Sequence, residues 1–238
     1  MTNEIYRGHL SDVAKLFTTS GFMKESQKKS NLDSTKILYV HKKVLKDGVQ
    51  ARTGAQQENY SYVVLVVDDR LNVDYLAFLI NSSPWKVMLG EGSKFFEGAS
   101  ISTSLGALKK LPVVMLFNEE QNACSFLNTL ITMTYDAIEK ESVEQDGFQN
   151  AYRFLLGIRD CIAMEILFDG VLSNPDISVL SSWIEKKTVY DNTSDKKEAL
   201  VTLFKSIFSS NDDLRDRMNK MRLYMDENAD AIFNNFPQ

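Results

Sequence analysis

Residues that could carry out covalent or metal chemistry are few and scattered in this chain of 238 residues. Two histidines and two cysteines leave no set of three or four zinc ligands at the usual spacing. Cys124 and Cys161 both lie in apolar, helix-like stretches, where a small buried thiol is far commoner than a nucleophile. No Gly-x-Ser-x-Gly elbow, Walker loop or dinucleotide fingerprint is present. The sequence therefore predicts no cofactor, no metal site and no catalytic residue.

Acidic residues offer the one enzymatic alternative. Asp68 and Asp69 follow an apolar run, and Glu91 and Lys94 come later in a glycine-punctuated stretch. Nucleases that use two metal ions need carboxylates that converge on one point, with a lysine near the attacked phosphate. An acidic pair is also an ordinary end of a strand, and the Glu91 to Lys94 spacing differs from the Glu-x-Lys of common nuclease cores. We therefore expect a protein that is not an enzyme, with a nuclease as the lesser alternative.

Basic and amide side chains gather in the first sixty residues, with Gln50 among them. Lysine and arginine neutralise phosphates, whereas glutamine and asparagine can read adenine edges in the major groove. The same residues also suit an ordinary solvated face, and both interpretations stay open. The candidates for contact with DNA are Lys24, Lys28, Lys29, Lys42, Lys43, Arg52, Gln56, Gln57 and Asn59.

Charge is distributed unevenly along the chain. Residues 1–118 carry 15 Lys+Arg against 11 Asp+Glu, and residues 119–238 carry 12 against 21. Such an asymmetry suggests two modules with different partners, the first of which can approach phosphates. Two ordinary solvated surfaces are the alternative.

The elements that must position the basic residues are predicted to mix helices and strands. Apolar residues at helical spacing predict a short helix over 8–19, and the polar, lysine-rich stretch 21–31 predicts a surface loop. The runs 36–45 and 60–69 are dense in β-branched and aromatic residues, which favours two strands joined by a polar loop. An apolar helix over 73–82 begins after an asparagine cap, and a second short helix follows it.

A strand over 112–117 leads into a long helix that begins after Asn118, where Glu119 and Glu120 favour the helix dipole. One apolar stripe over about twenty residues is typical of a helix that packs on a partner helix. The residues of this expected helix-pairing stripe are Phe126, Leu127, Leu130, Ile131, Tyr135 and Ile138.

The C-terminal hundred residues predict helices alone, over about 148–168, 175–186, 194–208 and 212–233. The domain boundaries that follow are a mixed α/β module over 1–118, a long connecting or dimerisation helix over 119–145, and an acidic helical domain over 146–238. We therefore expect an α+β fold with an all-α C-terminal bundle. No apolar run approaches the length of a membrane span and the N-terminus lacks a signal-peptide pattern, so we expect a cytoplasmic protein without membrane contact.

Four short sequence segments together resemble a known protein family. They are LSDVAKLF at 10–17, DYLAFLINS at 74–82, LPVV at 111–114 and EEQ at 119–121. In order and spacing they resemble a target recognition domain of the specificity subunits of type I restriction-modification systems, present here as a single, shortened copy. The likeness covers about residues 7–141.

The resemblance implies a recognition-domain-like fold for the first module and a non-catalytic function. It implies sequence-specific binding of double-stranded DNA, with a methyltransferase subunit as partner or a homodimer formed through the long helix. The alternative is a protein-protein interaction or regulatory adaptor on the same fold, which binds through its acidic helices and does not touch DNA.

Overall fold

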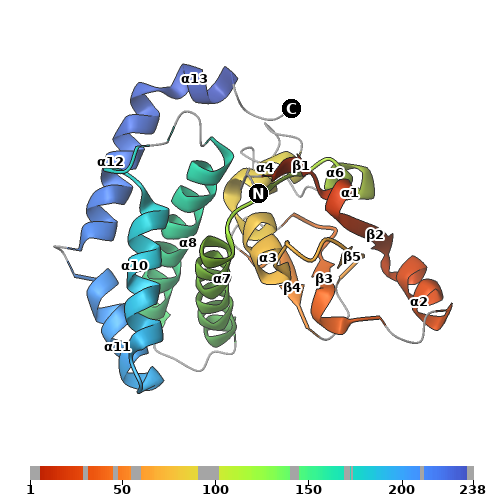
Figure 1. Cartoon of the computed structure of the whole chain (residues 1–238), viewed down its shortest axis with the longest axis horizontal. Helices are drawn as coiled ribbons and strands as arrows, with labels where there is room; N and C mark the ends of the chain where they lie inside the picture. The colour runs from red at the N-terminus through yellow and green to blue at the C-terminus, as the bar shows by residue number, and fades with distance from the viewer. Residues whose placement is uncertain are drawn as a thin grey trace. The chain divides into compact units, whose positions relative to one another are not determined.

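A computed structural model describes the chain over residues 6–28, 32–44, 48–54, 60–90, 102–139, 145–168, 172, 174–209 and 212–234. The chain separates into two compact units, Met1–Gln149 and Asn150–Gln238. Among the described residues, strands occur only in the first unit and the second is helical, so the predicted α+β class is confirmed (Figure 1). Within the same residues no helix combines the length and the apolar character that crossing a bilayer requires.

The larger sheet of the first unit has four antiparallel strands. Its order is β2 (Ala14–Thr18), β5 (Tyr62–Val66), β3 (Ile37–Val40) and β4 (Ala51–Thr53). The inner strands β5 and β3 consist almost entirely of β-branched, aromatic and leucine side chains, as a sheet covered on both faces requires. The two strands predicted over 36–45 and 60–69 are thus confirmed, but the loop predicted between them contains a further strand, β4, which pairs with β3.

A second, two-stranded sheet ties the start of the chain to residues more than a hundred positions later. Strand β1 (Tyr6–His9) pairs antiparallel with β6 (Pro112–Met115), so the predicted strand over 112–117 is confirmed. The short helix α1 (Leu10–Val13) follows β1 and contacts α6 (Leu105–Lys109), which precedes β6. The Leu10 amide donates to the Leu111 carbonyl at 2.8 Å.

Two predictions near the N-terminus were wrong. The predicted helix over 8–19 is only α1, because the residues on either side of it form β1 and β2, which gain sheet partners. The predicted loop over 21–31 contains the helix α2 (Thr19–Lys28). That helix is held by Phe22, which packs with Ile37, Tyr39, Tyr60 and Val63.

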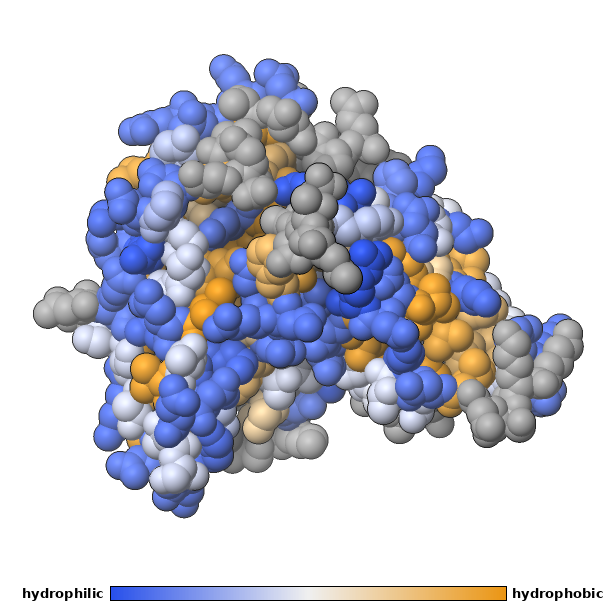
Figure 2. All heavy atoms as spheres, in the orientation of Figure 1, coloured by the Kyte–Doolittle hydropathy of each residue, from blue (hydrophilic) through white to orange (hydrophobic). Residues whose placement is uncertain are grey.

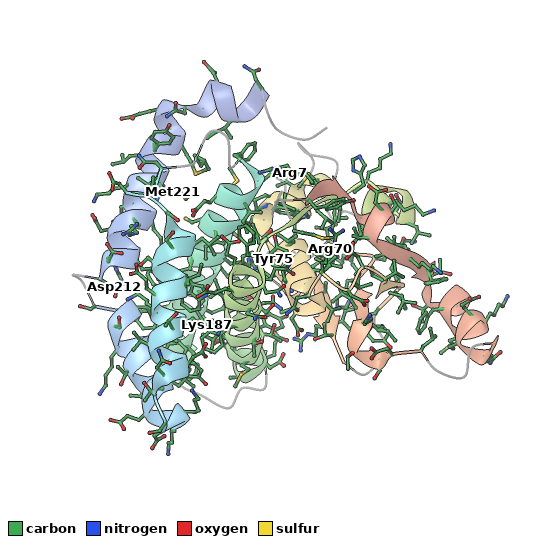
Figure 3. The ribbon with its side chains drawn as sticks, viewed as in Figure 1. Arg7, Arg70, Tyr75, Lys187, Asp212 and Met221 are labelled. Carbon is green, nitrogen blue, oxygen red and sulfur yellow. The ribbon has the colours of Figure 1, made fainter. Side chains whose placement is uncertain are left out.

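This cluster, with the partly buried Phe17, Leu32 and Leu65 against it, covers one face of the four-stranded sheet. Figure 2 shows hydrophobic residues gathered on this part of the first unit, beside α2. The opposite face contacts α3 (Val73–Asn81), which is followed by α4 (Ser83–Leu89). Asn72 caps α3 as expected, and Tyr75, labelled in Figure 3, donates to the Val114 carbonyl of β6 at 2.7 Å.

The long helix α7 (Asn118–Glu139) is confirmed, and it belongs to the first unit. It packs against α3 through polar as well as apolar side chains. Of the expected helix-pairing stripe, Leu127, Leu130 and Ile131 are buried in the chain, whereas Phe126, Tyr135 and Ile138 are half-buried.

The boundary between the units lies within α8 (Gln145–Leu167), most of which belongs to the second unit. That unit also contains α10 (Val179–Asn192), α11 (Lys196–Ile207), α12 (Asp213–Glu227) and α13 (Ala229–Asn234). Helix α10 contacts both α11 and α12, and the fully buried side chains of the unit include Trp183, Ile207 and Met221. Asp212, labelled with Met221 in Figure 3, caps α12 and also accepts from Lys186 at 2.5 Å. Helix α10 begins four residues later than predicted, because its cap is Ser178.

The distribution of charged residues between the two structural units differs from that between residues 1–118 and 119–238 of the sequence. The first unit holds 16 Lys+Arg and 18 Asp+Glu, and the second holds 11 and 14. The difference arises because residues 119–149, with one basic and seven acidic side chains, lie in the first unit. The basic surplus of residues 1–118 is therefore balanced within their own unit.

We predict that Asn81→Ala destabilises the first unit by about 2–4 kcal/mol, because it leaves both peptide groups of Ala51 without their buried partner. Each unit contains one tryptophan, Trp85 or Trp183. Urea unfolding followed by fluorescence in a Trp183→Phe background thus reports on the first unit alone. Lys109→Ala, at an exposed position of α6, is the control and should cost less than about 0.5 kcal/mol. Equal losses in the two variants would contradict the prediction.

Candidate nucleic-acid interface

Two of the predicted DNA-contacting lysines lie on the loop between β3 and β4, named here the lysine loop (residues 41–50, described over 41–44 and 48–50). The His41 amide donates to the Gln50 carbonyl at 3.0 Å, which closes the base of the loop. Lys42 and Lys43 are exposed. Their backbone is tied to a neighbouring segment, because the Thr103 amide donates to the Lys42 carbonyl at 2.8 Å.

Buried polar side chains hold the lysine loop from inside. The Gln50 amide donates to the carbonyls of His41 and Lys43, at 2.8 and 3.2 Å. The Lys86 ammonium donates to the Gly48 carbonyl at 2.7 Å. Gln50 and Lys86 are both fully buried. Because burying a lysine costs several kcal/mol unless it is well bonded, this arrangement holds the backbone firmly at His41, Lys43 and Gly48.

Gln50 has a structural role, whereas the sequence predicted that it could contact DNA. The sequence placed it among amides that could read adenine, but its side chain faces the interior and bonds the loop backbone. Lys86 was missed by the sequence reasoning. The signal that could have found it is a single lysine inside the apolar stretch SPWKVML, since a charge at such a position must find a buried partner.

Helix α2 starts at the same end of the sheet as the lysine loop. The Thr19 amide donates to the Ser61 carbonyl at 3.0 Å, and the Ser61 amide donates to the Val40 carbonyl at 3.2 Å, one residue before the loop. Lys24 is exposed on this helix. The fold thus brings the segments that carry Lys24, Lys42 and Lys43 to one end of the sheet, although they are separated in sequence.

The other predicted DNA contacts are placed only in part. Lys28 is the last residue of α2, and only its backbone is described. The remaining candidates Lys29, Gln56, Gln57 and Asn59 lie outside the described residues.

Arg52 joins β4 to the long helix α7. Its guanidinium donates two hydrogen bonds to the Asp136 carboxylate, at 2.9 and 2.5 Å, and lies 6.0 Å from the centre of the Tyr135 ring. The hydrogen bonds to Asp136 raise the pKa of Arg52 above its ordinary value, so the charge is held firmly in this pair. The arginine is therefore used inside the fold.

An aromatic group lies on the sheet next to this ion pair. The rings of Tyr60 and His41 are 4.1 Å apart, and those of Tyr60 and Tyr39 are 6.2 Å apart. Burial raises the pKa of Tyr60 to about 12 against the effect of Arg52, which lowers it. Tyr60 is thus a neutral, packed side chain at the base of the lysine loop.

The two carboxylates of the nuclease alternative that the structure describes, Asp68 and Asp69, are each paired with a cation. Asp68 accepts from Arg70, labelled in Figure 3, at 2.7 Å, and hydrogen bonding to Arg70 lowers the pKa of Asp68. Asp69 pairs with Lys36. Glu91 and Lys94 lie outside the described residues. Within the described part of the chain, no three His, Cys, Asp or Glu side chains are grouped so that they could hold a metal ion.

Both cysteines lie in helices, as the sequence predicted, but Cys161 of α8 is only half-buried. Cys124 is fully buried in α7. Burial raises the pKa of the Cys161 thiol to about 12. At neutral pH Cys161 is therefore a protonated thiol, which is a poor nucleophile.

No family model matches the chain, and no curated protein or solved structure is similar enough to it to count as a match. The likeness to a target recognition domain stays a prediction, which the four short segments of the sequence carry.

We predict that Tyr60→Phe reduces the alkaline destabilisation of the first unit. The folded protein keeps the Tyr60 proton up to a pKa of about 12, whereas the unfolded chain releases it near the ordinary value of 10.0. Stability that is present below pH 10 is therefore lost as the pH rises toward 12. Between pH 9 and pH 11 the wild type should lose about 1.3 kcal/mol more than the variant.

The measurement is urea unfolding at both pH values, read from Trp85 in the Trp183→Phe background. Tyr190→Phe, in the second unit, serves as the control and should follow the wild type. Parallel losses in wild type and Tyr60→Phe would show that Tyr60 does not hold its proton in the folded state.

Proposed function

We propose that the first unit is a non-catalytic DNA-recognition module, similar in role to a specificity subunit of a restriction-modification system. The observation that carries this proposal is the lysine loop, in which exposed Lys42 and Lys43 are presented by a backbone that the buried Gln50 and Lys86 hold in place. Holding the described backbone on both sides of the loop in place lowers the entropic cost of binding, because Lys42 and Lys43 are positioned before the ligand arrives.

Lysines without an internal partner are the natural phosphate ligands of this unit. Among the described residues Lys24, Lys42 and Lys43 form no ion pair. Their ammonium groups can release counterions from a phosphate backbone, which is the main source of affinity in many DNA-binding proteins. Arg52 is not included in the proposal, because Asp136 already neutralises it.

Because the charges of the first unit nearly balance, we expect DNA to be attracted by direct contacts at individual side chains and not by the overall field of the unit. A unit with 16 basic and 18 acidic side chains does not steer DNA by its overall field. Binding then depends on a few direct phosphate contacts at the lysine loop and α2. Affinity should be moderate and should fall as salt is added.

A single recognition unit implies a partner for the module. In this proposal a second copy of the chain supplies a second unit related by twofold symmetry, or a methyltransferase subunit binds beside it. The half-buried Phe126, Tyr135 and Ile138 of α7 are the residues of the expected pairing stripe that keep exposed surface for such a contact.

We predict that Lys42→Glu with Lys43→Glu weakens binding to duplex DNA at least tenfold and lowers the slope of log affinity against log salt by about 2, which is the loss of two phosphate contacts. The measurement is fluorescence anisotropy of the full chain with labelled random-sequence duplexes over a series of salt concentrations. Lys197→Glu with Lys205→Glu, in the second unit, makes the same change of charge and should leave binding intact.

Sequence preference is tested on the same chain by selecting tight binders from a pool of random duplexes. Enrichment of one motif supports a role in sequence recognition. Absence of duplex binding at low salt, or equal losses in the two double variants, would overturn the proposal and favour the adaptor alternative.

A further inference from the structure

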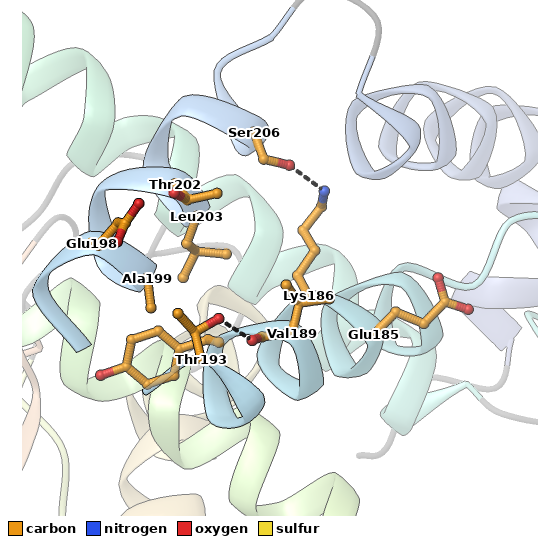
Figure 4. Close-up of a pocket in the computed structure, with 10 residues that line it drawn as sticks. Glu185, Lys186, Val189, Thr193, Glu198, Ala199, Thr202, Leu203 and Ser206 are labelled. Carbon is orange, nitrogen blue, oxygen red and sulfur yellow. Dashed lines mark hydrogen bonds between the residues drawn. The ribbon is translucent and has the colours of Figure 1, made fainter. Parts of the chain in front are cut away.

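The second unit contains a groove between α10 and α11, with a volume of about 430 Å³ (Figure 4). Its apolar lining comes from Val189 and Tyr190 of α10 and from Ala199 and Leu203 of α11. Val189 is 64% exposed, although it lies in the groove. An apolar side chain in this position gains free energy when a partner covers it.

The basic side chains around this groove are engaged within the unit. Lys186 donates to Ser206 at 2.8 Å and to Asp212 at 2.5 Å. Lys196 donates to the carbonyls of Tyr190 and Asp191, where its charge suits the C-terminal end of α10. Lys187 pairs with Asp191.

Two carboxylates of the groove are not engaged in this way. Glu185 and Glu198 line it and form no ion pair with any described residue. Figure 4 shows them toward opposite ends, with Glu185 beyond Lys186 and Glu198 beside Ala199. The groove lining therefore combines an apolar middle with, toward each end, a carboxylate that no described residue pairs with.

We propose that this groove binds an amphipathic helix of another protein, with an apolar face of about two turns and a lysine or arginine at each end. The lining extends from Glu185 of α10 to Thr193, the residue that caps the end of this helix, which is about 12 Å at 1.5 Å per residue and matches about two turns of a bound helix. Two adjacent helices present a furrow into which the side-chain ridge of a third helix packs. Apolar anchors at positions i, i+4 and i+7 contact Val189, Tyr190 and Leu203, and the flanking cations pair with the two glutamates.

This inference is independent of DNA binding, because it uses only residues of the second unit. Its test is selection of a phage-displayed library of random 16-residue peptides on the full chain. The expected winners carry apolar residues at helical spacing between two basic ends. Peptides without basic ends or without helical spacing, or a failure to enrich any sequence, would overturn the proposal.

Two exposed valines provide a matched pair of variants. Val189→Glu, inside the groove, should weaken binding of the selected peptides at least tenfold, whereas Val201→Glu, outside the lining and 47% exposed, should leave it unchanged. Glu185→Lys with Glu198→Lys should also weaken binding at least tenfold and transfer the preference to versions of the peptides with acidic ends. Binding that survives Val189→Glu, or that responds equally to both valine changes, would place the peptides elsewhere on the protein and contradict the groove.

Discussion

The first unit depends on one buried amide, the side chain of Asn81 at the end of α3. Its oxygen accepts from the Ala51 amide at 2.8 Å, and its nitrogen donates to the Ala51 carbonyl at 2.9 Å and to Asn128 of α7 at 3.0 Å. β4 is a short strand at the edge of the sheet, where backbone groups lack a strand partner. Asn81 supplies the missing partner, as a neighbouring peptide group would. One side chain thus fixes the end of the lysine loop, the edge of the sheet and the position of α7.

Gln121 performs the matching task at the other end of α3. Its side chain accepts from the Asn72 amide at 2.8 Å and donates to the carbonyls of Arg70 and Leu116 at 2.9 and 2.8 Å. Helix α7 is therefore bonded to both ends of α3 by buried amides. Apolar stripes alone tolerate sliding, whereas amides that must find these partners favour one register. The lysine loop is presented in one position because α3, which supports it, is held in this way.

Features whose interacting residues are close in sequence could be predicted, whereas contacts between residues far apart in sequence could not. The cap of α3 and the helical character of α7 were predictable, because Asn72 lies next to the residues that it caps and the apolar spacing of α7 repeats over many turns. The stretch 8–19 was too short for its period to distinguish a helix from strands, and pairing of β2 with β5 decided the outcome. Arg52 was predicted as a DNA contact because its partner Asp136, 84 residues later, cannot be recognised from spacing.

The same reasoning about internal partners connects the two proposed binding surfaces. In the first unit, acidic residues of α7 offset the basic surplus of the preceding segment, and Arg52 with Asp136 is one contact through which this occurs. In the second unit, Lys186 and Lys187 are similarly paired with aspartates. An ion pair within the fold has already lost part of its hydration and gained its partner, so exchanging that partner for a ligand gains little. Charges that form no ion pair among the described residues still have that interaction to gain. Lys42 and Lys43 in one unit, and Glu185 and Glu198 in the other, are therefore the groups that we expect to attract a ligand.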